Sequence, residues 1–141
     1  MSNLSLFLKS NKKKRENQFY AATKSLCDEK GNPLLWEFAP IDTRENQLLG
    51  EECTKELPSD NPGVFRTKTD YTAYTRKLIC RCCVFPDLLD KDLQESYGVQ
   101  NPEDLLLQMV DNPGEYGDLV EFIQRLNGFT PLSEKVEAAK N

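Results

Sequence analysis

The sequence contains the same helix start signal twice, and each copy precedes an apolar stripe. Asn101-Pro102 and Asn112-Pro113 each place a capping residue before proline. Proline suits the first helical position because the backbone N–H that it lacks has no partner there. The two stripes are Leu105, Leu106, Met109 and Val110, then Leu119, Phe122, Ile123 and Leu126. The pattern predicts two amphipathic helices, the second ending at Gly128, that must pack against another apolar surface.

The segment "FYAATKSLCDEKGNPLLWEFAPI" predicts a β-hairpin, which would provide this apolar surface. Two β-prone runs flank "DEKGNP", where Gly31 and Asn32 provide turn chemistry. The second run alternates between two sets of side chains. One set is Leu34, Trp36 and Phe38, and the other is Leu35, Glu37 and Ala39. This alternation predicts a strand with one apolar face, which Pro40 ends.

Four further helices and one loop are expected. Asp42, with Glu45 three residues later, predicts a helix over residues 42–53. Asp70 predicts a cap for a helix from Tyr71 to about Phe85, before Pro86. A short helix is expected in the segment 87–98, in which Gly98 follows the last helical residue. The prolines and glycine of residues 57–70 predict a surface loop, and Thr130-Pro131 predicts a last short helix.

These elements predict the α+β class. We expect an N-terminal β-hairpin or small antiparallel sheet followed by about five short helices, which pack against one face of the sheet. We expect residues 1–16 to form a flexible apolar and basic arm. Residues 17–141 are expected to form a single domain, since 141 residues suit one core.

The arm begins with an apolar cluster and continues into a basic run. Ser5 is a possible cap for a short helix in this segment. The cluster is too small to form its own core, so it must dock on the body, a second copy or a partner, or else stay mobile. We predict that it is a docking site for the partner or for self-association. Its residues are Leu4, Leu6, Phe7 and Leu8.

Charge is distributed unevenly along the chain. Residues 1–24 contain six basic residues and one acidic residue, so this segment is +5 and the rest is −10 within a total of −5. An acidic body argues against nucleic-acid binding. No apolar run is long enough to span a membrane, and the order of the N-terminal residues is not that of a secretion signal. We therefore expect a cytoplasmic protein with reduced cysteines.

The residue types disfavour catalysis. The chain has no histidine, which removes the commonest general base and the Ser-His and Cys-His nucleophilic pairs. Neither standard phosphate-binding loop is present. Asp87, Asp90 and Asp92 lack the glycine and later glutamate of a calcium loop, so they predict a solvated helix start. No catalytic residue, cofactor or metal ligand is predicted.

Three of the five cysteines are clustered at Cys80, Cys82 and Cys83. On a helix, Cys80 and Cys82 point about 160° apart, so the three thiols cannot hold one ion. Cys82 then shares an apolar face with residues that include Tyr71, Tyr74, Leu78 and Phe85. A strand through "LICRCCVF" would also separate Cys83 from the other two. We predict that Cys82 and Cys83 are buried, reduced and act as small hydrophobic residues.

Three segments of the chain occur in a distinctive order: "SNLSLFLKSNKKKRENQFYAATKSL", "DEKGNPLLWEFAPI" and "LLDKDLQESYGVQNPEDLLLQMVDNPGEYGDLVEFIQRLNGF". Together they resemble the phage XkdN-like tail assembly chaperone family of contractile-tailed phages and prophages of Gram-positive bacteria. The likeness covers nearly the whole chain and is strongest in "SYGV", "MVDNPGEY" and "LNGF". The three clustered cysteines are not part of the family's pattern.

The resemblance implies a non-enzymatic assembly factor of the bacterial host cytoplasm. Its expected partner is the tape measure protein, which it would bind and keep soluble before the tail tube polymerises. It would be absent from the mature virion. Two alternatives remain open: a structural tail protein that stays in the particle, and a small metal-binding regulator that uses the cysteines.

Overall fold

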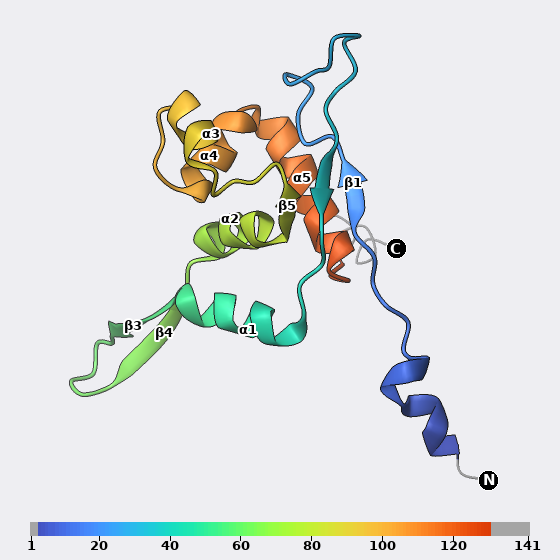
Figure 1. Cartoon of the computed structure of the whole chain (residues 1–141). Helices are drawn as coiled ribbons and strands as arrows, with labels where there is room; N and C mark the ends of the chain where they lie inside the picture. Colours follow the sequence, from blue (N-terminus) through green and yellow to red (C-terminus); the bar gives the residue numbers. More distant parts are fainter. Residues whose placement is uncertain (1–2, 131–141) are drawn as a thin grey trace, which may run out of the picture.

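The structure is a computed structural model that describes residues 3–130, and it confirms the α+β class (Figure 1). Its elements in chain order are η1 (Asn3–Phe7), η2 (Lys9–Asn11), β1 (Gln18–Tyr20), β2 (Trp36–Phe38), α1 (Thr43–Glu52), β3 (Thr54–Pro58), β4 (Phe65–Thr69), α2 (Tyr71–Cys82), β5 (Cys83–Phe85), α3 (Lys91–Ser96), α4 (Pro102–Met109) and α5 (Pro113–Leu126). Two antiparallel sheets are interspersed with the helices. The predicted order, one N-terminal sheet followed by helices, is therefore wrong.

The predicted N-terminal hairpin is present. Strand β1 pairs with β2 in antiparallel register, with Phe19 opposite Glu37. Gly31 adopts a φ of +85° in the turn, where glycine has no steric cost. Trp36 and Phe38 are buried as expected. The predicted place of Leu34 on the apolar face of the strand is wrong, because Leu34 precedes β2 and is exposed.

The predicted end of the helix that begins at Tyr71, at about Phe85, is also wrong. Helix α2 stops at Cys82, and Cys83–Phe85 is strand β5, which pairs with the second edge of β2. The Ala39 N–H donates to the Cys82 carbonyl over 2.8 Å at this junction. The sheet order is therefore β1-β2-β5. Backbone pairing with β2 replaces the last helical turn, because it satisfies the same polar groups and leads into Pro86.

The segment predicted as a loop forms the second hairpin. Strands β3 and β4 pair over five positions, from Thr54 opposite Thr69 to Pro58 opposite Phe65. Nearly all of its side chains are exposed, and it projects from the body (Figure 1). Neither face of this hairpin packs on a core, so its sequence lacks the alternation that reveals a half-buried strand.

The helix caps follow the sequence closely. The side chains of Asp42 and Asp70 accept backbone N–H groups at the starts of α1 and α2, and Asn101 and Asn112 do so at α4 and α5. Gly98 and Gly128 have positive φ, as expected after helix ends. The helix expected over residues 87–98 is shorter than predicted, because α3 begins at Lys91 after the Asp90 cap. The predicted helix at Thr130-Pro131 falls outside the described residues.

Helix α5 covers the inner face of the three-stranded sheet. The ring of Phe122 stacks on Tyr20 at 4.4 Å and meets Phe38 edge-on at 5.5 Å. At the end of α5, the Asn127 side chain accepts the Ile41 N–H over 2.9 Å and contacts the Cys82 sulfur at 3.4 Å. Asn127 thereby joins α5 to the β2–α1 connection and to α2. These bonds hold α1, α2 and α5 in place relative to one another.

Over residues 3–130, no helix combines the length and the apolar character required to cross a membrane.

Candidate partner-binding groove

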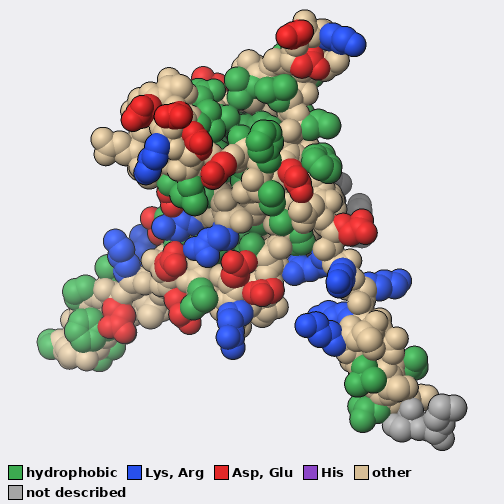
Figure 2. All heavy atoms as spheres, viewed as in Figure 1, with side chains coloured by type: hydrophobic (Ala, Val, Ile, Leu, Met, Phe, Trp, Pro, Cys, Tyr) green, Lys and Arg blue, Asp and Glu red, His purple; other side chains and the backbone are tan. Residues whose placement is uncertain are grey.

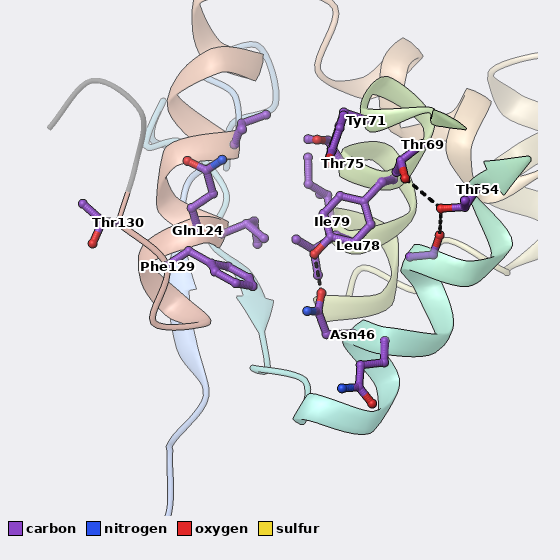
Figure 3. A pocket seen from close by; sticks show the side chains of 15 residues that line it. Asn46, Thr54, Thr69, Tyr71, Thr75, Leu78, Ile79, Gln124, Phe129 and Thr130 are labelled. Atoms are coloured by element: carbon purple, nitrogen blue, oxygen red, sulfur yellow. Dashed lines mark hydrogen bonds between the residues drawn. The ribbon is translucent and has the colours of Figure 1, made fainter. Parts of the chain in front are cut away.

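A groove of about 530 Å³ lies between α1, α2 and α5 (Figure 3). Its volume falls within the range of sites that bind ligands or several partner side chains. The lining residues are Asn46, Gln47, Gly50, Thr54, Thr69, Tyr71, Tyr74, Thr75, Leu78, Ile79, Val120, Ile123, Gln124, Phe129 and Thr130. We call this site the helical groove.

The floor and walls of the helical groove are mainly apolar. Leu78 and Ile79 of α2 and Ile123 of α5 are buried at its base. Tyr71, in the first turn of α2, and Phe129, just after α5, are both exposed. Figure 3 shows these two aromatic side chains on opposite sides of the site. The groove therefore offers two aromatic walls above an aliphatic floor, the arrangement that receives the apolar face of a helix.

The polar groups of the groove are largely engaged with one another. The Tyr74 hydroxyl donates to Asn46 Oδ1 and joins α2 to α1. Burial raises the pKa of Tyr74, so this hydroxyl stays protonated at neutral pH. Thr54 Oγ1 lies 2.8 Å from Thr69 Oγ1 and donates to the Gly50 carbonyl over 2.7 Å. These bonds fix the shape of the groove before any partner arrives.

Within residues 3–130, no charged residue lines the helical groove. The ion pairs between α1, α2 and α4 involve other residues, with Lys77 3.5 Å from Glu103 and Arg81 3.8 Å from Glu45. These pairs are half-exposed, so each contributes little to stability. Binding in the groove must therefore depend on apolar contact and shape, with little contribution from charge.

The predicted docking residues of the arm lie elsewhere. Leu4, Leu6 and Phe7 belong to η1, Leu8 follows it directly, and all four are exposed. The structure thus brings the cluster together on one short segment that extends from the body (Figure 1). None of the four lines the helical groove, so the apolar cluster and the groove are separate surfaces. Lys12 and Arg15, nearer the base of the arm, lie beside Asn46 and Phe129 of the groove.

The cysteines are placed mainly in packing roles. Cys82 is fully buried, as predicted, whereas Cys83 is only half-buried, which corrects its predicted burial. Burial raises the pKa of the Cys80 and Cys83 thiols to about 12, which keeps both thiols protonated at neutral pH and unreactive. Within residues 3–130, no three His, Cys, Asp or Glu side chains are arranged to hold a metal ion.

The sequence patterns do not predict the helical groove. Its signal was present, since Tyr71, Tyr74 and Leu78 share one face of α2, but that face was assigned entirely to the core. The structure buries Leu78 and leaves Tyr71 exposed, and it places Phe85 in an exposed position on β5. Only the C-terminal half of the apolar face meets α5, so its N-terminal half becomes a wall of the groove.

Comparison with known proteins identifies the family. The model of the family described as "Phage XkdN-like tail assembly chaperone protein, TAC" matches residues 4–140. Over 139 residues, the chain is 27% identical to phage-like element PBSX protein XkdN and 26% identical to protein YqbN, both of Bacillus subtilis (strain 168). Each alignment covers 98% of this chain and 93% of the relative.

The fold has also been seen in a solved structure. The crystal structure of YqbN superposes with a TM-score of 0.75 over 92% of this chain and 98% of that chain, at 22% identity. The family match spans nearly the whole sequence and includes the segments that form α1, α2 and α5. This protein therefore belongs to the phage XkdN-like tail assembly chaperone family.

Proposed function

We propose that this protein binds the tape measure protein and keeps it soluble before the tail tube polymerises around it. In this proposal the complex forms in the cytoplasm of the bacterial host, and the chaperone leaves before the particle is finished. Membership of the tail assembly chaperone family carries the proposal. The partner and its later release are inferences from that membership.

The helical groove supplies a binding site suited to such a partner. A long helical protein without its tube exposes apolar stripes, and exposed stripes of this kind promote aggregation. The groove presents Tyr71 and Phe129 above Leu78 and Ile123, so it can cover one apolar face of a helix. The described lining residues carry no charge, which suits a contact that tube subunits must later displace.

Co-expression tests the proposal. The cognate tape measure protein, produced alone, should be largely insoluble, and co-expression should move it to the soluble fraction as a co-purifying complex. Finished particles analysed by mass spectrometry should lack this protein. Unchanged solubility together with no complex would refute the chaperone role, and stoichiometric retention in particles would instead support a structural tail protein.

Two helix glycines provide a matched test of the groove. Gly50 lines the groove and Gly117 of α5 does not, and a Cβ added at either position meets no atom within 4 Å. Gly50→Leu should fill part of the groove and reduce capture of the tape measure protein at least tenfold. Gly117→Leu should fold equally well and capture normally. Equal capture by both variants would exclude the groove as the binding site.

A further inference from the structure

The outer face of the three-stranded sheet carries a row of exposed side chains, which we call the outer row. Phe19 lies opposite Glu37 across β1 and β2, and Glu37 lies opposite Phe85 across β2 and β5. Residues directly opposite in an antiparallel sheet project from the same face. Phe19 is 63% exposed and Phe85 is 64% exposed. Glu37 between them is half-buried and accepts a hydrogen bond from Asn17 Nδ2 over 2.8 Å, and the register of β2 and β5 shifts after Glu37.

The two faces of this sheet differ in their cover. The inner face packs Trp36 and Phe38 against the core, whereas the exposure of Phe19 and Phe85 shows that no element within residues 3–130 covers the outer row. Leu35, just before β2, is exposed as well. Figure 2 shows hydrophobic side chains gathered over this region of the body. Exposed apolar side chains that are grouped in this way favour an interaction surface.

The N-terminal arm has complementary properties. Its turns are held by their own bonds, including Asn11 Nδ2 to the Ser5 carbonyl at 2.8 Å. Its base is fixed to the body where Arg15 Nη2 donates to the Ile41 carbonyl over 2.6 Å. The two 3-10 turns of the arm, η1 and η2, bury none of their residues. Phe7, the last residue of η1, is 83% exposed, so the apolar cluster is accessible to another molecule.

We propose that two copies of this chain exchange arms, each apolar cluster packing on the outer row of the other copy. The exchange is reciprocal, so one twofold axis closes the dimer. Charge supports a second copy as the occupant. Residues 9–15 contain five basic residues, whereas the chain beyond residue 24 is −10, and Glu37 lies at the centre of the outer row. Among residues 3–130, the lining of the helical groove contributes no charge that would bind the basic run.

The outer row and the helical groove share no described residue. The exchange therefore does not rest on the proposed function, even though Lys12 and Arg15 of the arm lie beside Asn46 and Phe129 of the groove. A monomeric variant that still captures the tape measure protein would separate the two ideas, since it would remove the dimer and keep the chaperone activity.

Sedimentation equilibrium of the full chain measures the dimer directly. We expect a monomer–dimer equilibrium in the micromolar range that weakens as salt screens the basic arm. The arm variant Leu6→Ser/Phe7→Ser and the face variant Phe19→Ser/Phe85→Ser should each raise the dimer Kd at least tenfold. Phe65→Ser is the matched control, because Phe65 is also 64% exposed, and it should leave the Kd unchanged.

Mixing the two weakened variants gives the sharper test. The arm variant keeps an intact outer row and the face variant keeps an intact arm, so together they should form a heterodimer through one arm–face contact. The proposal would be overturned if the chain were monomeric at all concentrations. It would be overturned equally if each arm packed on the sheet of its own chain. A dimer insensitive to both variants, or a mixture without heterodimers, would overturn it as well.

Discussion

The two hairpins of this protein are similar in form and opposite in their environment. In the β1–β2 hairpin, Trp36 and Phe38 are buried, α5 covers the inner face and β5 adds a third strand. In the β3–β4 hairpin, five cross-strand pairs are made with almost no burial. Backbone pairing and a few polar side-chain bonds thus maintain the second hairpin, while the first is part of the core. An isolated two-stranded hairpin is only marginally stable, so the stability of the protein should depend mainly on the first.

The largest expected contrast is between two phenylalanines. Phe38→Ala removes a fully buried ring from the contact with Phe122 and should lower the free energy of unfolding by about 3–5 kcal/mol. Phe65→Ala, at the exposed end of β4, should change it by no more than about 0.5 kcal/mol. Urea denaturation followed by circular dichroism measures both. Similar losses for the two variants would show that the second hairpin is also part of the cooperative core.

The next effect concerns the junction that carries the second hairpin. The Asp70 side chain accepts the Ala73 N–H over 3.1 Å at the start of α2, and its backbone N–H donates to the Cys53 carbonyl over 2.8 Å. Asp70→Ala removes only the cap and should cost about 1 kcal/mol. Asp70→Asn retains a capping oxygen, so it should behave like the natural chain in the same denaturation experiment. An equal loss for both variants would show that the cap is not the cause.

The contrast also explains what the sequence could and could not predict. Alternation around Trp36 and Phe38 revealed the first hairpin because one of its faces is buried. The caps at Asp42, Asp70, Asn101 and Asn112 were predictable because capping is local. Residues 54–69 carry no such pattern, since a hairpin exposed on both faces has no apolar period to detect. Local turn residues therefore predicted a loop where long-range pairing formed strands.

The same limit applies to the candidate sites. The arm cluster was visible because its apolar residues are adjacent in sequence. The helical groove joins Asn46 of α1, Tyr71 of α2 and Phe129 after α5, and the outer row joins residues of three strands. Both depend on tertiary contacts between distant segments, above all on β5 replacing the expected last turn of α2. No spacing rule within one segment predicts that replacement.

A smaller effect is expected where the first hairpin is anchored to α5. Glu115 accepts the Lys24 N–H and the Thr23 hydroxyl, each over 2.8 Å, and these bonds lower its pKa below the usual 4.5. The unfolded chain therefore takes up a proton at this group at higher pH than the native chain does. The stability that it contributes is full above pH 4.5 and is lost as the pH falls through the lowered pKa. Glu115→Gln should flatten this part of the stability–pH curve, measured by thermal unfolding between pH 3 and 6. An unchanged curve would show that other carboxylates dominate the acid response.

The smallest effect on global stability should come from the turn of the second hairpin. Gly63 has a φ of +81°, a conformation that strains any residue with a Cβ. Gly63→Ala should therefore loosen the β3–β4 ladder and speed hydrogen exchange of its amides. The free energy of global unfolding should change by no more than about 0.5 kcal/mol, because a ladder that buries almost nothing can open without the core. If the amides of β2 and β5 also lost protection, the two hairpins would unfold as one unit, and the difference in burial between them would not separate their stabilities.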